Sequence, residues 1–380
     1  MLPFNKAYIT GDEVTYINHA MQSGKIAGDG YYTKACEHFF EEKYNFKKAL
    51  LTSSCTDALE LAALLINIKS GDEVLMPSYG FSSTANAFIL RGAKIVFADS
   101  GRDNPNIDLS QIEALITPLT KAIVVVHYGG IACDMHELKK LTDRYKIILI
   151  EDAAQAIDCF YKNRPLGSFG HLAVFSFHET KNITCGEGGL LVINDKKFIK
   201  RAEIIREKGT NRPAFIRKEV EEYNWVDIGS SFLPSDITAA YLYAQLNKLD
   251  IIQAKRRQLW EQYNKAFYDL DKQNIIKTPY IPAHRIHNGH VFYIICKSAQ
   301  TRDMYINYML LNGVQTKSHY ITLHDSPFYK KIHGKRILPI AKVYQLRLVR
   351  LPIFFDMEES DINKVITLTH KFFLEESNAG

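Results

Sequence analysis

The chain has 380 residues and a mass of 43.4 kDa, which is long for one average domain and short for three. Hydrophobic residues make up 46% and charged residues 23%, as in an ordinary globular protein, which excludes disordered, collagen-like and coiled-coil chains. The formal net charge is only +5, and no long basic run concentrates it, so the sequence does not indicate nucleic-acid binding.

The N-terminal sequence, the aliphatic runs and the cysteines indicate the cellular compartment. The N-terminal sequence MLPFNKAYITGDEV has no apolar stretch typical of a signal peptide, and the longest aliphatic runs, such as residues 123–126 and 147–150, are too short to cross a bilayer. The six cysteines are scattered without a CxxC pair, which argues against a disulfide framework and a zinc site. We therefore expect a cytoplasmic protein with reduced thiols, no metal and no membrane association.

Residues 50–195 alternate between two patterns. Short β-branched and aliphatic runs, typical of buried strands, occupy residues 73–76, 94–98, 122–126, 147–150, 173–176 and 190–193. Helical stretches at 57–66, 83–91, 110–116 and 135–145 separate the earlier runs. This alternation predicts βαβ units in a mostly parallel sheet with both faces covered. Such sheets bind ligands at the carboxyl ends of their strands, here at Pro77, Asp99, His127 and Asp152.

The second half of the sequence has a different residue pattern. Residues 195–206 and 234–270 have the pattern of long helices. From about residue 275 proline, aromatic and basic residues mix, and we expect strands at 291–296 and 314–317, a helix between them, and a last helix at 360–373. The sequence thus predicts a large α/β domain over residues 1–250 and a smaller α+β domain over residues 251–380.

Two segments place polar residues where a buried strand ends. LTSSCTDALELAALL, residues 51–65, puts Ser53, Ser54 and Thr56 at the start of a helix, which suits a phosphate group but also an ordinary helix cap. IEDAAQAI, residues 150–157, puts Glu151 and Asp152 at the end of an aliphatic strand. A carboxylate buried there needs a positive or N–H partner, although many such aspartates are structural.

A third segment is sharper. In AVFSFHETKNITCGEGGLLVIND, residues 173–195, a strand is followed by a polar turn with His178, Glu179 and Lys181 and then by a glycine-rich turn. A lysine at the end of a buried strand is a candidate nucleophile for carbonyl chemistry. The zinc motif HExxH is incomplete, because Asn182 stands where it needs a histidine. Neither GDGYYTK nor GEGG matches a dinucleotide or P-loop motif.

One cofactor uses all three segments together. Pyridoxal 5'-phosphate (PLP) requires a phosphate site, an anion against its pyridine nitrogen and a lysine for the Schiff base. The order of the three segments on an α/β chain therefore favours a PLP enzyme over three separate structural roles.

These segments resemble the DegT/DnrJ/EryC1/StrS family of sugar aminotransferases. The resemblance runs from GKIAGDG at residues 24–30 to RLPIF at 350–354, through GDEVLMPSYGFSSTANAF, VVVHYGG, EDAAQA, FSFHETKN and GEGG. It implies the PLP-dependent transferase fold type I, like that of aspartate aminotransferase. A large domain with a mostly parallel sheet would carry a smaller α+β C-terminal domain.

The resemblance also implies roles for individual residues. Lys181 would be the Schiff-base lysine and proton shuttle, and Asp152 would pair with the pyridinium nitrogen. Ser231 stands in a stretch where the family usually has an asparagine, and it would reach the phosphate from the partner subunit of a homodimer whose active sites lie at the interface. The other cofactor contacts, to the phosphate, the ring face and the ring hydroxyl, would be Thr56, the backbone of Asp57, Ser176, Phe81 and Gln155.

Five segments match one branch of the family: GDGYYT, LTSSCTDALELAALL, SFHETKN, REKGTNR and DIGSSFLPSD. This match implies transfer of the amino group of L-glutamate to a dTDP-linked keto-sugar, dTDP-4-oxo-6-deoxy-D-glucose. The products would be 2-oxoglutarate and dTDP-4-amino-4,6-dideoxy-D-galactose, for a cell-surface polysaccharide such as O-antigen or enterobacterial common antigen. His324 corresponds to a histidine near the substrate in family members. Candidates for the pyrophosphate, each also a plausible surface charge, are Arg206, Lys208, Arg212 and Lys317.

Several alternatives stay open. The gluco epimer of the product, or amination at carbon 3, would need only different sugar contacts. A non-catalytic member of the family is disfavoured by the presence of both Lys181 and Asp152, and a 3-dehydratase by the lysine at 181, where that branch has histidine. We expect His127 to be a hydrogen-bonded structural residue and Tyr320 to fill the core of the small domain.

Overall fold

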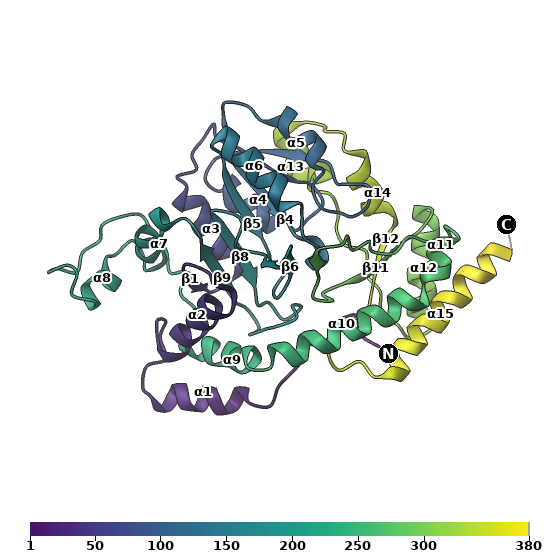
Figure 1. Ribbon diagram of the computed structural model, residues 1–380, viewed down its shortest axis with the longest axis horizontal. Coiled ribbons are helices and arrows are strands. Elements are labelled where there is room, and N and C mark those ends of the chain that lie inside the picture. The colour runs from purple at the N-terminus through teal and green to yellow at the C-terminus, as the bar shows by residue number, and fades with distance from the viewer. Residues whose placement is uncertain (379–380) are drawn as a thin grey trace.

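The computed structural model of the protein describes residues 1–378 and has an α/β architecture (Figure 1). Its main sheet has the strand order β1-β9-β8-β5-β4-β2-β3. These strands are β1 (Ala49–Thr52), β2 (Glu73–Pro77), β3 (Lys94–Ala98), β4 (Thr120–Val126), β5 (Ile148–Asp152), β8 (Leu172–Ser176) and β9 (Gly189–Ile193). Neighbouring strands from β3 to β8 pair in parallel, whereas β9 is antiparallel to both β1 and β8. The mostly parallel sheet is confirmed.

Both faces of this sheet are buried. In β4, Ile123 and Val125 belong to one apolar cluster and Ala122 and Val124 to the other, because successive side chains of a strand point to opposite faces. The first cluster packs against α2 (Tyr31–Tyr44), α6 (Met135–Tyr145) and α9 (Asp236–Leu246), and the second against α3 (Cys55–Leu65), α4 (Ser82–Ile89) and α7 (Ile199–Arg206). The continuous aliphatic runs of the sequence follow from this double burial.

Of the remaining helices, α1 (Glu13–Gln22) packs against α9, and most of the others follow the main sheet in the chain. These others are α5 (Leu109–Leu115), α8 (Arg212–Ile216), α10 (Leu249–Ala266), α11 (Tyr268–Lys272), α12 (Ala299–Leu311), α13 (Pro327–His333), α14 (Pro339–Arg347) and α15 (Glu359–Asn378). Short strands β6 (Phe160–Tyr161), β7 (Arg164–Pro165) and β10 (Arg285–Ile286) form a second small sheet. No helix in residues 1–378 combines the length and apolar character that spanning a membrane requires.

A third apolar cluster lies in the C-terminal part. It joins α10, α12 and α15 to the antiparallel pair β11 (Phe292–Ile295) and β12 (Leu348–Leu351). Leu2 also belongs to it, and the Leu2 N–H donates to the Gly313 carbonyl at 2.8 Å. The first residues of the chain therefore pack on its C-terminal part. The division into domains at residue 250 stays a prediction.

Two predicted elements are wrong in detail. The single helix expected over residues 234–270 is three helices, because the chain leaves helical geometry at Lys248 and again at Phe267. The strand expected at 314–317 is not a strand. Val314 makes an isolated bridge to Leu2, and Lys317 makes one to Arg350.

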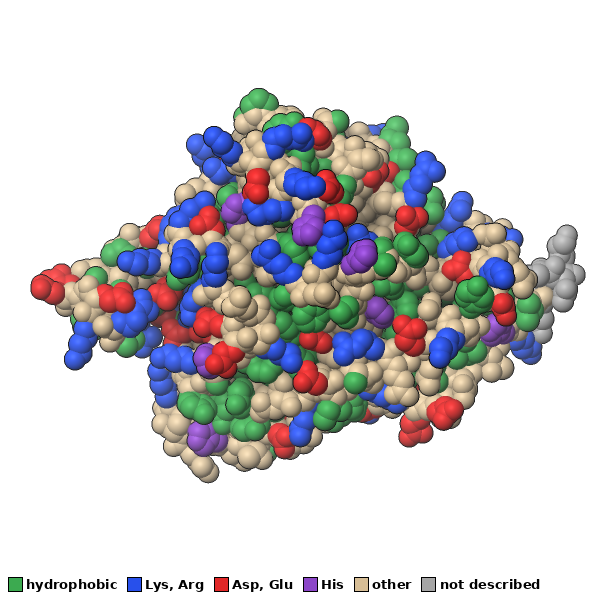
Figure 2. Space-filling view, in the orientation of Figure 1, with side chains coloured by type: hydrophobic (Ala, Val, Ile, Leu, Met, Phe, Trp, Pro, Cys, Tyr) green, Lys and Arg blue, Asp and Glu red, His purple; other side chains and the backbone are tan. Residues whose placement is uncertain are grey.

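On the face shown in Figure 2, basic and acidic side chains are interspersed.

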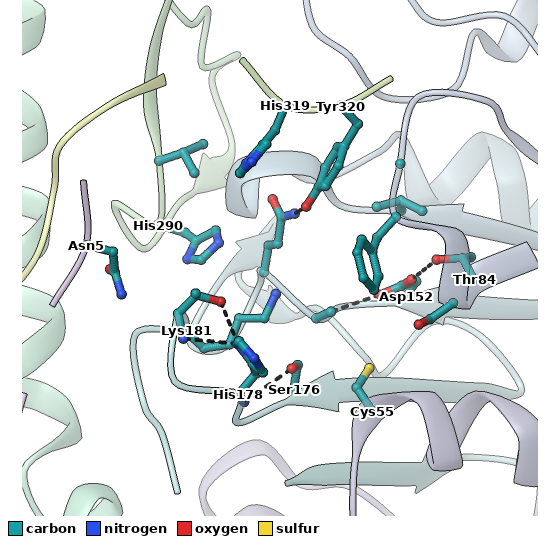
Figure 3. A pocket seen from close by; sticks show the side chains of 18 of the residues that line it. Asn5, Cys55, Thr84, Asp152, Ser176, His178, Lys181, His290, His319 and Tyr320 are labelled. Carbon is teal, nitrogen blue, oxygen red and sulfur yellow. Dashed lines mark hydrogen bonds between the residues drawn. The ribbon is translucent and has the colours of Figure 1, made fainter. Parts of the chain in front are cut away.

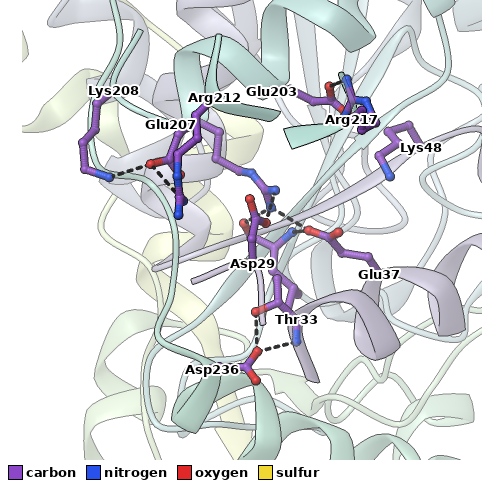
Figure 4. Close-up of polar contacts among 12 residues, drawn as sticks. Asp29, Thr33, Glu37, Lys48, Glu203, Glu207, Lys208, Arg212, Arg217 and Asp236 are labelled. Atoms are coloured by element: carbon purple, nitrogen blue, oxygen red, sulfur yellow. Dashed lines mark hydrogen bonds and ion pairs between the residues drawn. The ribbon is translucent and has the colours of Figure 1, made fainter. Parts of the chain in front are cut away.

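A buried ion network ties α7 to the N-terminal segment (Figure 4). The Arg206 guanidinium, only 4% exposed, donates to Oε1 of Glu37 and to Oδ1 of Asp29, both at 2.6 Å, and to the Leu51 carbonyl. Burial raises the pKa of the Glu37 carboxyl, and the charge of Arg206 opposes that rise. Arg206 is therefore engaged within the fold and is not available to a pyrophosphate group.

Removing this cation is expected to be costly. Arg206→Gln leaves the Glu37 carboxylate buried without a counterion, so we expect the free energy of unfolding to fall by about 3–5 kcal/mol. Urea unfolding followed by circular dichroism measures it. Arg217→Gln is the matched control, because Arg217 makes its ion pairs at the exposed surface, and its unfolding midpoint should hardly move. Equal midpoints for the two variants would contradict the prediction.

A buried neutral histidine packs against the third cluster. His287 is 8% exposed, its ring lies 4.3 Å from that of Trp260, and its Nδ1 accepts the Gly289 N–H at 3.1 Å. Burial, helped by the charge of Arg257, lowers the pKa of His287 from 6.5 to about 4. The unfolded chain therefore binds a proton before the folded chain does. The contribution of His287 to stability is complete above pH 6.5 and is lost as the pH falls towards 4.

This shift predicts a measurable acid sensitivity. At pH 5 the loss from His287 should be about 2 kcal/mol relative to pH 7. His287→Asn keeps an acceptor for the Gly289 N–H and cannot take up the proton, so it should remove that part of the pH dependence. Urea midpoints at the two pH values test this, with the exposed His38→Asn as control. The same pH dependence in both variants would rule out the assignment to His287.

Candidate active site

A cavity of about 500 Å³ lies at the carboxyl ends of the parallel strands, between the main sheet and the C-terminal part (Figure 3). Strands β5 and β8 contribute their last residues to its wall, and loops around residues 290 and 319 close it from the other side together with β12. Six of the predicted catalytic and cofactor-binding residues line this one cavity: Thr56, Phe81, Asp152, Gln155, Ser176 and Lys181.

The start of α3 forms one end of the cavity. Ser54 caps the helix, its Oγ accepting the Asp57 N–H at 3.0 Å, and Thr56 Oγ1 donates to Ser83 Oγ at 2.9 Å. Strand β9 begins so close that a Cβ on Gly189 would lie 2.4 Å from the Ser54 carbonyl carbon. Free N–H groups of a first helical turn beside several hydroxyls form an anion site. The Asp57 N–H predicted to serve it is occupied by Ser54.

Asp152 is a buried carboxylate without a counterion. It ends β5, is 5% exposed, and accepts hydrogen bonds from Thr84 Oγ1 at 2.6 Å and from the Ala154 N–H at 3.1 Å. Figure 3 shows it at the cavity wall beside Thr84. No lysine, arginine or histidine of the described chain forms an ion pair with it. Because a buried charge is costly unless it is paired, a cationic group in the cavity would complete this site.

The neighbouring Glu151 serves the fold instead. Its carboxylate contacts His127 Nε2 at 3.0 Å and accepts three backbone N–H groups from the loop at 167–170. His127 Nδ1 accepts the Cys133 N–H, so the ring is held by hydrogen bonds on both sides. The structural role predicted for His127 is confirmed.

Lys181 lies in the turn after β8, where its N–H donates to the His178 carbonyl at 2.9 Å. Its side chain runs into the cavity (Figure 3), and its amine has no carboxylate partner in the described chain. Cys55 lines the same wall, and burial raises the pKa of its thiol well above the usual range, with a further increase from the Asp152 charge. The thiol is therefore neutral, and the role of Lys181 as the nucleophile stays a prediction that its place in the cavity supports.

The far wall brings Tyr320 beside two of the predicted cofactor contacts, Gln155 and Phe81. The Tyr320 hydroxyl accepts a hydrogen bond from Gln155 Nε2 at 3.1 Å, while Gln155 Oε1 accepts the Gly129 N–H at 2.7 Å. Tyr320 was expected in the small-domain core, and that expectation is wrong: it lies on the cavity wall, 6.2 Å from the ring of Phe81. The cavity is thus bounded by two aromatic rings on this side.

His290 also faces the cavity and is neutral. Burial lowers its pKa well below the usual range, and the charges of Lys181 and Arg350 add to this. Asn182 donates from its amide to Gln253 and to the Asn288 carbonyl, so its oxygen accepts from His290 Nδ1. The proton is therefore on Nδ1, which leaves Nε2 as an acceptor. The signal in the sequence is the polar run HNGH directly before β11.

Several predicted residues, Asp57 among them, are not in the lining of the cavity. Lys208 and Arg212 contact Glu207, at 3.1 and 3.7 Å, and Ser231 is exposed beside the same residue. His324 is 3% exposed, and its Nδ1 contacts Ser78 Oγ at 2.6 Å. Their contacts with ligands stay predictions.

Comparison with known proteins gives the family. A family model described as the DegT/DnrJ/EryC1/StrS aminotransferase family matches residues 7–369. The chain belongs to this family. It is 32% identical to the uncharacterized protein MJ1066 of Methanocaldococcus jannaschii over 98% of both chains.

Solved structures of aminotransferases have the same fold. TlmJ from Streptoalloteichus hindustanus is 26% identical with a TM-score of 0.91, covering 99% of this chain and 100% of that one. DesV from S. venezuelae, in complex with a ketimine intermediate, is 27% identical with a TM-score of 0.89, covering 98% of both. As a member of the DegT/DnrJ/EryC1/StrS family, the protein is a PLP-dependent aminotransferase of fold type I.

The cavity fits this cofactor. The carboxylate of Asp152, which lacks a cation, suits a protonated ring nitrogen, and the start of α3 with the hydroxyls of Thr56 and Ser176 suits a phosphate. The amine of Lys181, in the same cavity, suits the aldehyde of the cofactor. The three groups that the sequence predicted far apart in the chain thus share one cavity.

Proposed function

We propose that the protein is a dTDP-4-amino-4,6-dideoxygalactose transaminase. It takes the amino group of L-glutamate, releases 2-oxoglutarate, and aminates carbon 4 of dTDP-4-oxo-6-deoxy-D-glucose to give dTDP-4-amino-4,6-dideoxy-D-galactose. The sugar would enter a cell-surface polysaccharide such as O-antigen or enterobacterial common antigen. Membership of a sugar aminotransferase family and the five branch-matching segments support this substrate.

One observation supports the proposed transamination. A lysine amine and a buried carboxylate without a counterion face the same cavity, next to the anion site at the start of α3. A structural lysine or aspartate would have found a partner in the fold, because unpaired charges destabilise a buried site. Their pairing with a bound ligand explains both.

Each residue of the cavity has a separate role in the proposed reaction. When bound, PLP accepts the electrons released at the carbon that carries the amino group. The Asp152 carboxylate, fixed by Thr84 and the Ala154 N–H, keeps the proton on the ring nitrogen. The Nζ of Lys181 moves the proton to and from the reacting carbon. Phe81 and Tyr320 bound the space from one side, where the Phe81 ring would stack on the pyridine face.

We further propose a homodimer with Ser231 reaching the phosphate of the partner's site. The segment 211–231 with α8 projects from the body of the chain (Figure 1) and carries several exposed apolar side chains. Trp225 is 81% exposed and Ile216 61% exposed. Large exposed apolar residues on a projecting segment are typical of an interface. Sedimentation would show a monomer if this proposal were wrong.

The substrate is tested with the purified holoenzyme, L-glutamate and a set of dTDP- and UDP-linked keto-sugars, with products identified by NMR. We expect only dTDP-4-oxo-6-deoxy-D-glucose to react well and its product to have the galacto configuration. If NMR instead finds the gluco epimer or an amine at carbon 3, the proposed product is wrong and the corresponding alternative function holds. Reaction of a UDP-sugar alone would overturn the nucleotide assignment.

A further inference from the structure

A second pocket lies at the opposite end of the β11–β12 pair from the active site. It has a volume of about 280 Å³ and shares no lining residue with the active-site cavity. Its walls are formed by residues 274–277 and 295–297, by one face of α14, and by Arg102 from the loop after β3. Its floor is apolar, and Ile276 and the ring of Tyr344 are buried there.

The charged side chains of this pocket are all basic. Arg102, Lys277, Lys297 and Arg347 line it, and no aspartate or glutamate of the described residues does. Lys277 forms an ion pair with Asp271 at 3.1 Å. The side chains of the other three make no hydrogen bond or ion pair within residues 1–378. Three unpaired cations from separate segments of the chain therefore surround one small pocket.

Contacts within the fold hold α14 against the loop that carries Arg102. The Asp99 carboxylate accepts the N–H groups of Ile340 and Ala341, at 3.0 and 2.7 Å, and so caps the start of α14. The Tyr344 hydroxyl donates to the carbonyls of residues 101 and 102, at 2.8 and 3.0 Å. The walls are therefore fixed by the protein itself, and the three cations are not needed to hold them together.

The sequence around Arg347 contains no acidic residue that could neutralise it. Residues 326–355 include seven lysines and arginines and no aspartate or glutamate, although the whole chain has 47 basic and 42 acidic residues. Asp103 follows Arg102 in the chain but is not part of the lining. Neighbouring cations repel one another, so an anion bound between them would lower the free energy of this region.

We propose that this pocket binds the phosphate group of a small phosphate ester. The planar guanidiniums of Arg102 and Arg347 match phosphate oxygens through paired N–H donors, and Lys297 adds a point charge. Three unpaired cations suit a dianion better than the single charge of a carboxylate. The apolar floor suits the organic part of the ester. Pockets for drug-sized ligands measure about 300–1,000 Å³, so this smaller one does not hold a whole nucleotide-linked sugar.

Binding is measured by isothermal calorimetry of phenyl phosphate with the PLP-loaded enzyme, in which the cofactor occupies the phosphate site of the active-site cavity. We expect saturable binding that weakens as salt is added. Inorganic phosphate, which lacks the apolar part, and benzoate, which has one charge, should bind less tightly. Arg347→Gln should weaken the binding of phenyl phosphate about 10-fold.

Lys331→Gln is the matched control, because it removes an exposed cation of the same acid-free stretch outside the pocket. Its affinity for phenyl phosphate should equal that of the wild type. Both variants should keep the melting temperature and the rate of the half-reaction with L-glutamate, since neither residue lines the active-site cavity. The absence of saturable binding to the wild type, or equal affinities of the two variants, would overturn the proposal, whichever sugar the enzyme aminates.

A second measurement distinguishes a soluble ester from a lipid headgroup. The protein is sedimented with vesicles of phosphatidylcholine, with and without phosphatidic acid. Binding that requires phosphatidic acid, is displaced by phenyl phosphate and is lost in Arg347→Gln would assign the pocket to a lipid headgroup. Binding of phenyl phosphate without sedimentation on either vesicle would assign it to a soluble ester.

Discussion

Replacing Lys181 with alanine is expected to abolish transamination, lowering kcat by at least about 10³-fold. The reason is that the turn after β8 supplies the amine of the cavity, and no second lysine among the described residues lines it. After reduction with borohydride, peptide mapping should find the cofactor attached at Lys181 in the wild type and nowhere in the variant. A small amine added to the solution should restore part of the proton transfer.

The control separates chemistry from folding. The amine of Lys181 makes no ion pair in the described chain, so Lys181→Ala should keep the melting temperature of the wild type. Lys121→Ala removes an exposed lysine on the main sheet and should keep full activity. A Lys181→Ala enzyme with more than about 1% of wild-type activity, or a covalent label on another side chain, would contradict the assignment.

The parts of the site that could be predicted are those written into short local patterns. Thr56, Asp152, Ser176 and Lys181 each lie within a few residues of the end of a strand, and buried parallel strands have a strong apolar signature. Because parallel strands end at one edge of the sheet, their polar neighbours had to meet there. The same logic predicted the mostly parallel sheet.

The residues of the opposite cavity wall have no comparable local pattern in the sequence. Arg350 lies on β12, which pairs with β11 across more than fifty residues of sequence, and His319 reaches the cavity from an irregular loop. Only the register that pairs Tyr293 with Arg350 brings this cation to the cavity. The failed strand at 314–317 has the same origin: single bridges from different parts of the fold hold these residues, and local propensity does not encode them.

Replacing Asp152 with asparagine is expected to lower kcat by about 10²- to 10³-fold while preserving the fold. The amide is nearly isosteric, its oxygen can still accept the Ala154 N–H, and Thr84 can turn its hydroxyl to accept from the new NH₂ group. What is lost is the negative charge that holds a proton on the cofactor's ring nitrogen. Thr84→Val is the matched variant, because it removes one hydrogen bond and keeps the charge, so its loss should stay below about 10-fold.

A cofactor analogue makes this prediction specific. Methylation of the ring nitrogen gives a ring that is permanently cationic and needs no protein anion to keep it charged. In Asp152→Asn such an analogue should restore activity relative to PLP, whereas in the wild type it should be no better than PLP. Without that rescue, the carboxylate would only orient the loop that follows β5, through its bond to the Ala154 N–H. Rescue by the analogue would instead show that the Asp152 carboxylate acts on the charge of the ring nitrogen. A buried carboxylate without a counterion has its strongest electrostatic influence on a cation close to it.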